Sequence, residues 1–308
     1  MLDFEDLRLI RALDHNGSLA AAARALNITP PAVSLRLKRI EQTLGVHLVS
    51  RAARGSSFTD EGLRLRDEAV ALLDRLESVP EVVADSASAL AGNLRIGAPL
   101  GFGRRYVAPL VRSFCSRYPR VVASLTLSEK PLAETSGMDL VFHIGVIKDS
   151  SLIRHHLAPN DRFVCASEEY VRLHGIPQHP SELSEADCLC LRENNEDVAL
   201  WRFFSAAAHL ESPKTRHAVQ VKVKPFMSSN DGEVISQWAQ EGMGFMLRSE
   251  WEAAPLIQQG RLVRVLADWQ LEEAPVLALV PSRSGTSARL RRFLEHTKQA
   301  LKFAPWRK

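Results

Sequence analysis

The 308-residue sequence predicts an α/β protein in three parts: an N-terminal winged helix-turn-helix, a long linker helix and a C-terminal domain of two lobes. Residues 18–51 contain two short helical patterns separated by a break, which is typical of a helix-turn-helix. From Leu94 onward, short apolar runs alternate with amphipathic segments, and this alternation indicates βαβ units. We place the three parts at residues 1–60, 61–90 and 91–308.

The helix-turn-helix prediction rests on the residues that begin and end each helix. Ser18 is a good N-cap for the first helix, and Asn27 stands where a chain often leaves a helix in the left-handed conformation. Thr29 can cap the second helix, and Pro30 and Pro31 then fall in its first turn, where a missing N–H does no harm. The two helices are therefore expected to end and begin around residues 27–29.

The second helix has one apolar side and one basic, small-polar side. Six basic residues and one acidic residue lie between Arg24 and Arg54, whereas the whole chain has a net charge of only +3, so the basicity is local. A local basic surface on a compact element suits the phosphates and major groove of double-stranded DNA. A solvated face of an ordinary surface helix is the less favoured alternative. The candidate DNA contacts are Thr29, Pro30, Pro31, Ser34, Leu35, Arg36, Lys38 and Arg39 in the helix, and Arg51 and Arg54 in a strand-turn-strand wing.

The linker segment carries a heptad-like apolar pattern from Thr59. The pattern comprises Leu65, Ala69, Leu72, Leu76, Val79 and Val83. Such a face needs a partner, so we expect a homodimer formed through this helix, with packing inside one subunit as the alternative. Pro80 predicts a bend near Ser78.

The C-terminal domain is expected to hold two α/β lobes, each with a mostly parallel sheet. Lobe one would comprise about residues 91–164 and 268–308, and lobe two about residues 165–267. Ligands bind at the carboxyl ends of strands in such sheets, so the cleft between the lobes is the predicted ligand site. The candidate ligand contacts are Pro99, Leu100, Gly101, Phe102, Ser128 and His143 in lobe one, and Ser229, Asn230 and Asp231 in lobe two. For His143, a purely structural role is the favoured alternative.

Other classes of site find less support. No apolar run approaches the eighteen residues of a membrane helix, and the acidic, amphipathic N-terminal stretch does not resemble a signal peptide, so we expect a cytoplasmic protein without membrane contact. The four cysteines fit no zinc pattern, and His155 and His156 would point to opposite sides of a strand. We therefore predict neither a metal nor a cofactor.

Several motifs together resemble one family of bacterial proteins. They are "AAAARALNITPPAVSLRLKRIEQTLGVHLVSR", "LRIGAP", "DLVFHIG", "CASEEYVRLHG", "SSNDGEVISQWAQEGMGFMLRSEW" and "GRLVRVLADW", and their order and spacing are similar to those of LysR-type transcriptional regulators. The resemblance implies a dimerising linker helix, an effector-binding domain of two periplasmic-binding-protein-like lobes, and dimers that pair into homotetramers.

This sequence departs from the family at positions that would contact DNA or ligand. Pro30 and Leu35 stand where the family often has Gln and Arg, so the usual base preferences do not transfer. His143 stands where an Arg is common, and a Ser or Thr usual near Pro99 is also missing.

Three classes of function were compared. A regulator that responds to a small molecule, namely a small carboxylate, fits best. A solute-binding receptor would explain only the second half of the chain. An enzyme is disfavoured because the sequence has no nucleophile–base signature and no P-loop.

Overall fold

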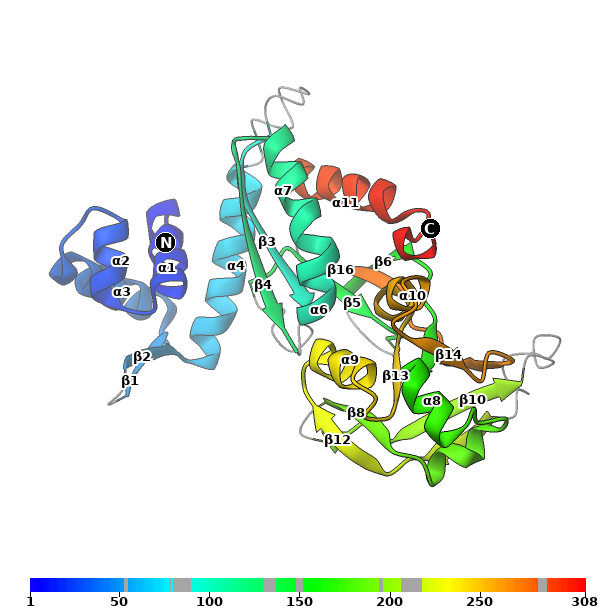
Figure 1. Ribbon diagram of the computed structural model, residues 1–308. Helices are drawn as coiled ribbons and strands as arrows, with labels where there is room; N and C mark the ends of the chain where they lie inside the picture. Colours follow the sequence, from blue (N-terminus) through cyan, green and yellow to red (C-terminus); the bar gives the residue numbers. More distant parts are fainter. Residues whose placement is uncertain are drawn as a thin grey trace.

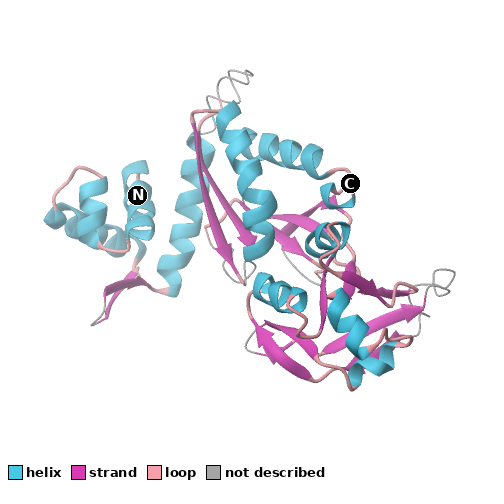
Figure 2. Cartoon of the chain, in the orientation of Figure 1, coloured by secondary structure: helices cyan, strands magenta, loops and turns pink. Residues whose placement is uncertain are grey.

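The fold was examined in a computed structural model that describes residues 1–52, 55–77, 79, 90–129, 137–147, 152–193, 196–205, 218–281 and 287–308. An N-terminal helical unit lies on one side of helix α4, and two lobes built around β-sheets lie on the other (Figure 1). Both lobes combine helices with strands (Figure 2), so the predicted α/β fold class is confirmed. Within these residues, no helix is both long and apolar enough to span a membrane.

The N-terminal unit contains α1 (Phe4–Asn16), α2 (Leu19–Ala25) and α3 (Pro30–Leu44). The Ser18 hydroxyl accepts a hydrogen bond from the Ala21 amide at 3.2 Å, and Thr29 Oγ1 accepts one from the Ala32 amide at 3.4 Å. Asn27 has φ 55°, in the left-handed region. These contacts confirm the predicted caps and the turn of the helix-turn-helix.

A two-stranded wing follows α3. Strands β1 (Val49–Ala52) and β2 (Gly55–Phe58) pair antiparallel. A Cβ atom on Gly62 would lie 2.0 Å from the carbonyl oxygen of Leu48, so a glycine is needed for α4 to approach the chain just before the wing. Arg54 and the side chain of Arg51 fall outside the described part of the chain.

Helix α4 (Asp60–Glu77) has two apolar faces with different surroundings. Ala69 and Leu73 are buried and complete the core of the N-terminal unit. Leu72 is 50% exposed, as is Val79 beyond the helix, and Leu63 and Leu76 are also exposed. Packing inside one subunit thus accounts for one face, whereas the other is unburied in the single chain. The expected bend at Ser78 and Pro80, and the position of Val83, lie outside the described residues.

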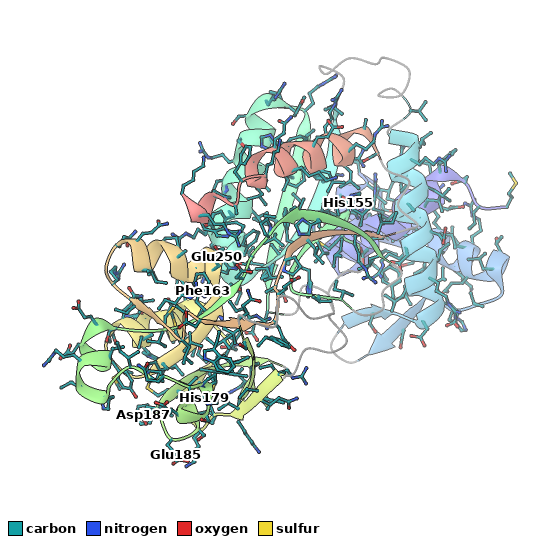
Figure 3. The ribbon with its side chains drawn as sticks, turned by 90° about the vertical axis from the view of Figure 1, so that its right-hand side faces the viewer. His155, Phe163, His179, Glu185, Asp187 and Glu250 are labelled. Atoms are coloured by element: carbon teal, nitrogen blue, oxygen red, sulfur yellow. The ribbon has the colours of Figure 1, made fainter. Side chains whose placement is uncertain are left out.

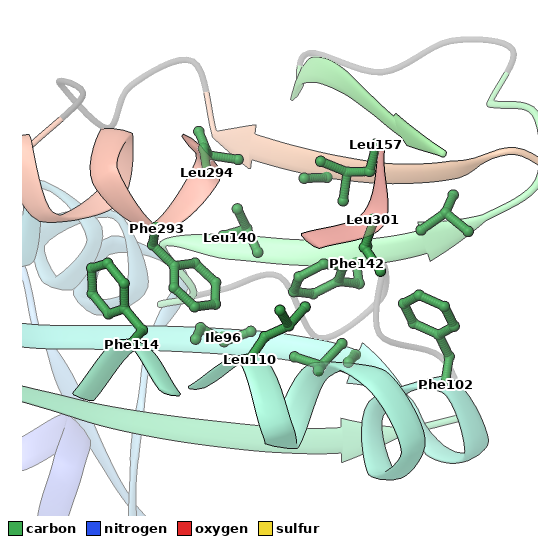
Figure 4. Close-up of a cluster of buried hydrophobic side chains, with 14 of the residues drawn as sticks. Ile96, Phe102, Leu110, Phe114, Leu140, Phe142, Leu157, Phe293, Leu294 and Leu301 are labelled. Atoms are coloured by element: carbon green, nitrogen blue, oxygen red, sulfur yellow. The ribbon is translucent and has the colours of Figure 1, made fainter. Parts of the chain in front are cut away.

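Lobe one is built on a five-stranded sheet with the order β4-β3-β5-β16-β6. Helices α7 (Ala108–Arg117) and α11 (Ala288–Leu301) cover it and bring Phe114 against Phe293, with ring centroids 5.1 Å apart (Figure 4). The chain from β3 enters α7 through α6 (Leu100–Phe102) and a π-helical turn (Gly103–Val107). The strands are β3 (Gly92–Pro99), β4 (Val121–Ser128), β5 (Leu140–Ile144), β6 (Leu152–Ala158) and β16 (Val276–Pro281).

Lobe two contains a sheet with the order β12-β8-β13-β7-β14 and a second, antiparallel sheet β11-β10-β15. The strands are β7 (Arg162–Ala166), β8 (Cys188–Glu193), β9 (Glu196–Asp197), β10 (Leu200–Ser205), β11 (Ala218–Lys222), β12 (Pro225–Ser229), β13 (Phe245–Ser249), β14 (Val263–Val265) and β15 (Trp269–Leu271). The helices are α8 (Glu168–His174), α9 (Gly232–Gln240), α10 (Glu250–Gln258) and a 3-10 helix (Pro180–Ser184). The chain returns to lobe one and ends with a short 3-10 helix (Pro305–Arg307).

The expectation of a mostly parallel sheet needs a correction in each lobe. Strand β16 pairs antiparallel with both β5 and β6, and β7 pairs antiparallel with both β13 and β14. Each of these is the first strand after the chain crosses from the other lobe. A strand that arrives from the hinge enters its sheet at the cleft edge, so it must run opposite to strands that end at that edge.

The sheets also locate the two crossings between the lobes. Strand β6 belongs to lobe one and β7 to lobe two, so the first crossing lies at residues 159–161 rather than near 165. Strand β15 pairs with β10 in lobe two, so the return crossing lies at residues 272–275 rather than near 268. Pairing between strands that are distant in sequence decides these positions.

Candidate DNA-binding helix and ligand cleft

Helix α3 presents a mixed face to solvent. Val33, Leu37 and Ile40 are buried in the N-terminal core, as the apolar spacing predicts. On the opposite side Leu35 is 72% exposed and Lys38 is exposed. Thr29, Pro30 and Pro31 are exposed at the start of the helix, and Ser34 is half-buried. This face is therefore available for contact with a groove.

Two candidate DNA contacts of α3 turn instead toward α1. Arg36 Nε donates to Asp6 Oδ1 at 2.8 Å, and its Nη2 donates to Asp3 Oδ1 at 3.0 Å. Arg39 Nη2 donates to the same Asp6 oxygen, although its side chain remains 54% exposed. Asp3 and Asp6 lie outside residues 24–54, and they offset part of the positive charge of that segment. Both arginines thus hold α3 against α1. Lys38 is the basic residue of α3 whose charge remains exposed on the opposite side.

Asp6 remains ionised in this network. Burial disfavours its charged form, but hydrogen bonds from Arg36 and from the Asp3 amide, together with Arg39, outweigh that cost and lower the pKa of Asp6 below 3.8. The carboxylate therefore holds both arginines at neutral pH.

A cleft of about 590 Å³ lies between the two lobes. It brings together most of the predicted ligand contacts from both halves of the domain. They are Pro99, Leu100, Gly101, Phe102, Ser128 and His143 from lobe one and Asn230 from lobe two.

Two predicted ligand contacts do not line the cleft among the described residues. Ser229 Oγ accepts a hydrogen bond from the Asp231 amide at 3.1 Å. Asp231 Oδ1 accepts one from the Glu233 amide at 2.8 Å and thereby caps α9. Their side chains are used to build the start of the helix, which is a common use of Ser and Asp before a helix.

Three arginines that the sequence reading missed form the lobe-two wall. Arg162, Arg192 and Arg248 all line the cleft. Arg192 Nη2 donates to Ser228 Oγ at 2.8 Å, and Arg162 Nη1 lies 3.9 Å from a carboxylate oxygen of Glu272. Arg192 and Arg248 stand near the carboxyl ends of β8 and β13, where ligand contacts are expected, so the strand patterns could have identified them. Arg162 begins the antiparallel strand β7, and no local pattern of residues indicates that direction.

The lobe-one wall has a different chemistry. Burial lowers the pKa of His143, so its imidazole is neutral at pH 7 and can donate or accept one hydrogen bond. Ser128 ends β4, and Glu129 follows it at the same wall. The three guanidinium groups of the cleft thus all belong to lobe two, which also contributes Glu233, whereas lobe one offers neutral groups and Glu129.

The lobes also contact each other beside the cleft. Arg104 Nη2 of lobe one lies 2.6 Å from Glu233 Oε2 and 3.3 Å from Asp231 Oδ2 of lobe two. Asn230 donates a hydrogen bond to Glu129 across the same gap. These polar contacts can form and break without disturbing either core.

A second polar cluster lies at the hinge. Asn160, in the first crossing, accepts a hydrogen bond from the Trp251 amide at 3.1 Å and donates one to the Ala274 carbonyl at 2.8 Å. Arg307 Nε donates to Glu250 Oε1 at 2.7 Å, and Figure 3 shows Glu250 at the junction of the lobes. The two crossings and the C-terminal segment are therefore tied together.

Two buried cysteines of lobe two are protonated at neutral pH. Burial raises the pKa values of Cys165 and Cys188 to about 12, so both are thiols at neutral pH. Among the described residues, no group of three or more His, Cys, Asp and Glu side chains could hold a metal ion.

A helix-turn-helix with an exposed second helix, joined to a two-lobed ligand cleft, defines the class of ligand-responsive DNA-binding regulators. Residues 4–63 match the family model described as the bacterial regulatory helix-turn-helix protein of the lysR family. Residues 87–302 match the model described as the LysR substrate binding domain. The chain belongs to the LysR family, and it is a DNA-binding transcriptional regulator with an effector-binding domain.

Relatives and solved structures agree with this assignment. The chain is 34% identical to the HTH-type transcriptional regulator DmlR of Escherichia coli K12, over 96% of this chain and 93% of that protein. It is also 34% identical to the HTH-type transcriptional activator TtdR of Escherichia coli, over 86% and 83% of the two chains. The structure of CrgA, a LysR-type regulator from Neisseria meningitidis, is similar with a TM-score of 0.60 and 27% identity, covering 98% of this chain and 99% of that one.

Proposed function

We propose that α3 reads a specific sequence in the major groove of double-stranded DNA. Leu35 and Ser34 would face base edges, with Leu35 giving an apolar contact such as one to a thymine methyl group. Lys38 and the wing residues Arg51 and Arg54 would bind phosphates. Thr29, Pro30 and Pro31 would approach the backbone at the start of α3, while Arg36 and Arg39 would act mainly by holding α3 in place.

The second part of the proposal is a homodimer formed through α4, with two dimers pairing into a tetramer. Its support is the exposed apolar face of that helix, which comprises Leu72 and Leu76 and continues at Val79. Burying such a face against a second copy is favourable, since each apolar side chain removed from water contributes about 1–2 kcal/mol. Two recognition helices would then reach successive major grooves.

The third part is that the effector is a small carboxylate. The single observation that carries it is the group of three arginines, Arg162, Arg192 and Arg248, in one wall of the cleft. Guanidinium groups bind carboxylates through strong, charge-assisted hydrogen bonds. The cytoplasm is the compartment in which such a regulator would meet both its DNA and its ligand.

The mechanism follows from the position of the cleft. A ligand that contacts both walls favours the closed arrangement of the lobes, and it can act only to the extent that it binds one arrangement better. Closure would move lobe two relative to lobe one and to the neighbouring subunits. The spacing of the DNA-binding units, and hence the bending of the DNA, would change with it.

The proposal is tested by footprinting the protein on the intergenic region upstream of its own gene, with and without pooled small carboxylates. We expect protection of two or more half-sites and a change in its extent with one pool. Protection that no pool alters would contradict the carboxylate part alone. Absence of protection at low salt would contradict the reading of α3 as a groove-binding helix.

A further inference from the structure

Arg248 is held in the cleft wall by a single buried carboxylate. Its side chain is 12% exposed, and its Nε and Nη2 both donate to Glu252 Oε2, at 2.8 and 2.5 Å. Glu252, one helical turn later in α10, has a side chain that is only 8% exposed. Within the described part of the chain, Nη1 of Arg248 makes no hydrogen bond, so this nitrogen remains to bind a ligand in the cleft.

The guanidinium also lies against Gly232, the first residue of α9, and Nη2 is its nearest atom. A Cβ atom on Gly232 would lie 1.8 Å from Nη2 and 2.4 Å from Cζ of Arg248. The backbone of Gly232 is not in the left-handed region, so its conformation does not require glycine. Glycine also weakens a helix by about 1 kcal/mol relative to alanine. Space for Arg248 is therefore the physical reason for glycine at this position.

A second cleft arginine begins the strand that pairs with β13. In the register of β13 with β7, Ser249 lies opposite Arg162 and Arg248 lies opposite Phe163, so the two arginines leave opposite faces of the sheet. Because β7 runs antiparallel, its first residue and the last residues of β13 meet at the cleft edge. Both arginines therefore reach the cleft, and Arg248 is held there by Glu252 and Gly232 and not by the strand pairing.

We propose that Gly232 and Glu252 are positioning residues that determine the ligand class of the cleft by fixing Arg248 with its Nη1 toward the effector's carboxylate. The inference rests on the proposed function, because it deepens the assignment of a carboxylate effector. The guanidinium remains a cation when it is paired with Glu252, so its Nη1 can make a charge-assisted hydrogen bond to a carboxylate that it cannot make to an uncharged amide. A side chain at position 232 would push the guanidinium away from Glu252 and from the ligand.

The test is isothermal titration of the full chain with acetate, butyrate, succinate, glutarate and benzoate, each compared with its uncharged amide. We expect the wild type to bind at least one acid and not its amide. Arg248→Met and Gly232→Ala should each weaken that binding at least tenfold. Glu252→Gln, which keeps an acceptor oxygen, should weaken it less.

The double variant Gly232→Ala/Arg248→Met separates positioning from a general effect on the fold. If Gly232 acts through Arg248, adding Gly232→Ala to Arg248→Met causes no further loss of affinity. All variants should keep wild-type DNA affinity, which a general defect would lower. An acid that binds Gly232→Ala or Arg248→Met within twofold of the wild type overturns the inference and leaves the carboxylate proposal standing. A wild type that binds no acid overturns both.

Discussion

The DNA-binding helix and the ligand cleft are built in opposite ways. The side chains of α3 that we propose to face the groove lie within residues 29–38, in one helix and its N-cap. The cleft draws its side chains from both lobes and from segments between Pro99 and Trp251. Local periodicity therefore describes the helix well, whereas only the packing of distant strands brings the residues of the cleft together.

Arginine–carboxylate pairs occur in both regions and have different consequences. Asp3 and Asp6 draw Arg36 and Arg39 toward α1 and so reduce what α3 offers to a phosphate. Glu252 binds Nε and Nη2 of Arg248, which lines the cleft, and Nη1 makes no hydrogen bond to the described residues. The same pairing thus stabilises a fold in one region and prepares a binding group in the other.

Asp6→Ala is expected to have the largest effect, because it leaves Arg36 and Arg39 without their buried partner. The free energy of unfolding of the N-terminal unit should fall by about 3 kcal/mol, the low end for breaking a buried pair, since both arginines stay partly exposed. Urea denaturation measures this loss. Asp3→Asn, which keeps an N-cap, is the matched control and should cost much less.

The pairing of Asp6 with Arg36 and Arg39 also predicts how the stability of the N-terminal unit changes with pH. The pKa of Asp6 is lowered in the folded state, so its stabilisation is present above about pH 4 and is lost as the pH falls through the lowered value. Asp6→Ala should therefore flatten the loss of stability in acid. A wild type and variant with parallel acid profiles would show that the pair does not stabilise the unit.

Leu35→Arg is the next largest expected change, and it concerns specificity. A new arginine in the groove can discriminate one base pair by about 2 kcal/mol, so base preference should change at one position in each half-site. A selection from random DNA sequences measures it. Leu44→Arg, at the far end of α3, should leave the selected site unchanged. An unaltered site with Leu35→Arg would remove Leu35 from the interface.

Lys38→Ala should weaken binding to all sequences alike, by about 1 kcal/mol near physiological salt. One lost phosphate contact lowers the slope of log affinity against log salt by about 0.9. Titrations at four salt concentrations measure this slope, and Lys38→Arg should retain it. A change in base preference with an unchanged slope would contradict the assignment of Lys38 to a phosphate.

Arg104→Met removes the contacts between the lobes beside the cleft, and of these variants it should have the smallest effect. Exposed ion pairs contribute about 0.2–1 kcal/mol, so effector affinity should change by no more than about fivefold, and DNA affinity should not change. Arg105→Met, its sequence neighbour, is the control. A tenfold or larger change in effector affinity would mean that the Arg104 contacts with Asp231 and Glu233 dominate lobe closure.

Much of the fold was predictable because its signals are local. Ser18, Asn27 and Thr29 mark the helix ends, and the apolar runs mark most strands of both lobes. The direction of β7 and β16 was not predictable, since it depends on where the chain crosses between lobes. The small antiparallel sheet of β10, β11 and β15 also depends on pairing over long sequence distances.

Residues that line the cleft could be predicted where a single stretch of sequence supplies several of them. The strand end at Pro99–Phe102 lines the cleft as expected, and Asn230 does too. Ser229 and Asp231 were assigned to the ligand because their polar groups precede a helix, but those groups satisfy the helix itself. A polar side chain just before a helix can either bind a ligand or cap the helix, and sequence alone does not distinguish these two roles.

The sequence by itself determined the family, the three-part organisation and the two helices of the helix-turn-helix, because these depend on residue order and periodicity. Only the tertiary structure decided that Arg36 and Arg39 pair with α1, and that Arg162, Arg192 and Arg248 share one wall. The physical reason is that a hydrogen bond or ion pair acts over a few ångströms. Its partners can be separated by any length of chain, so folding has to bring them together.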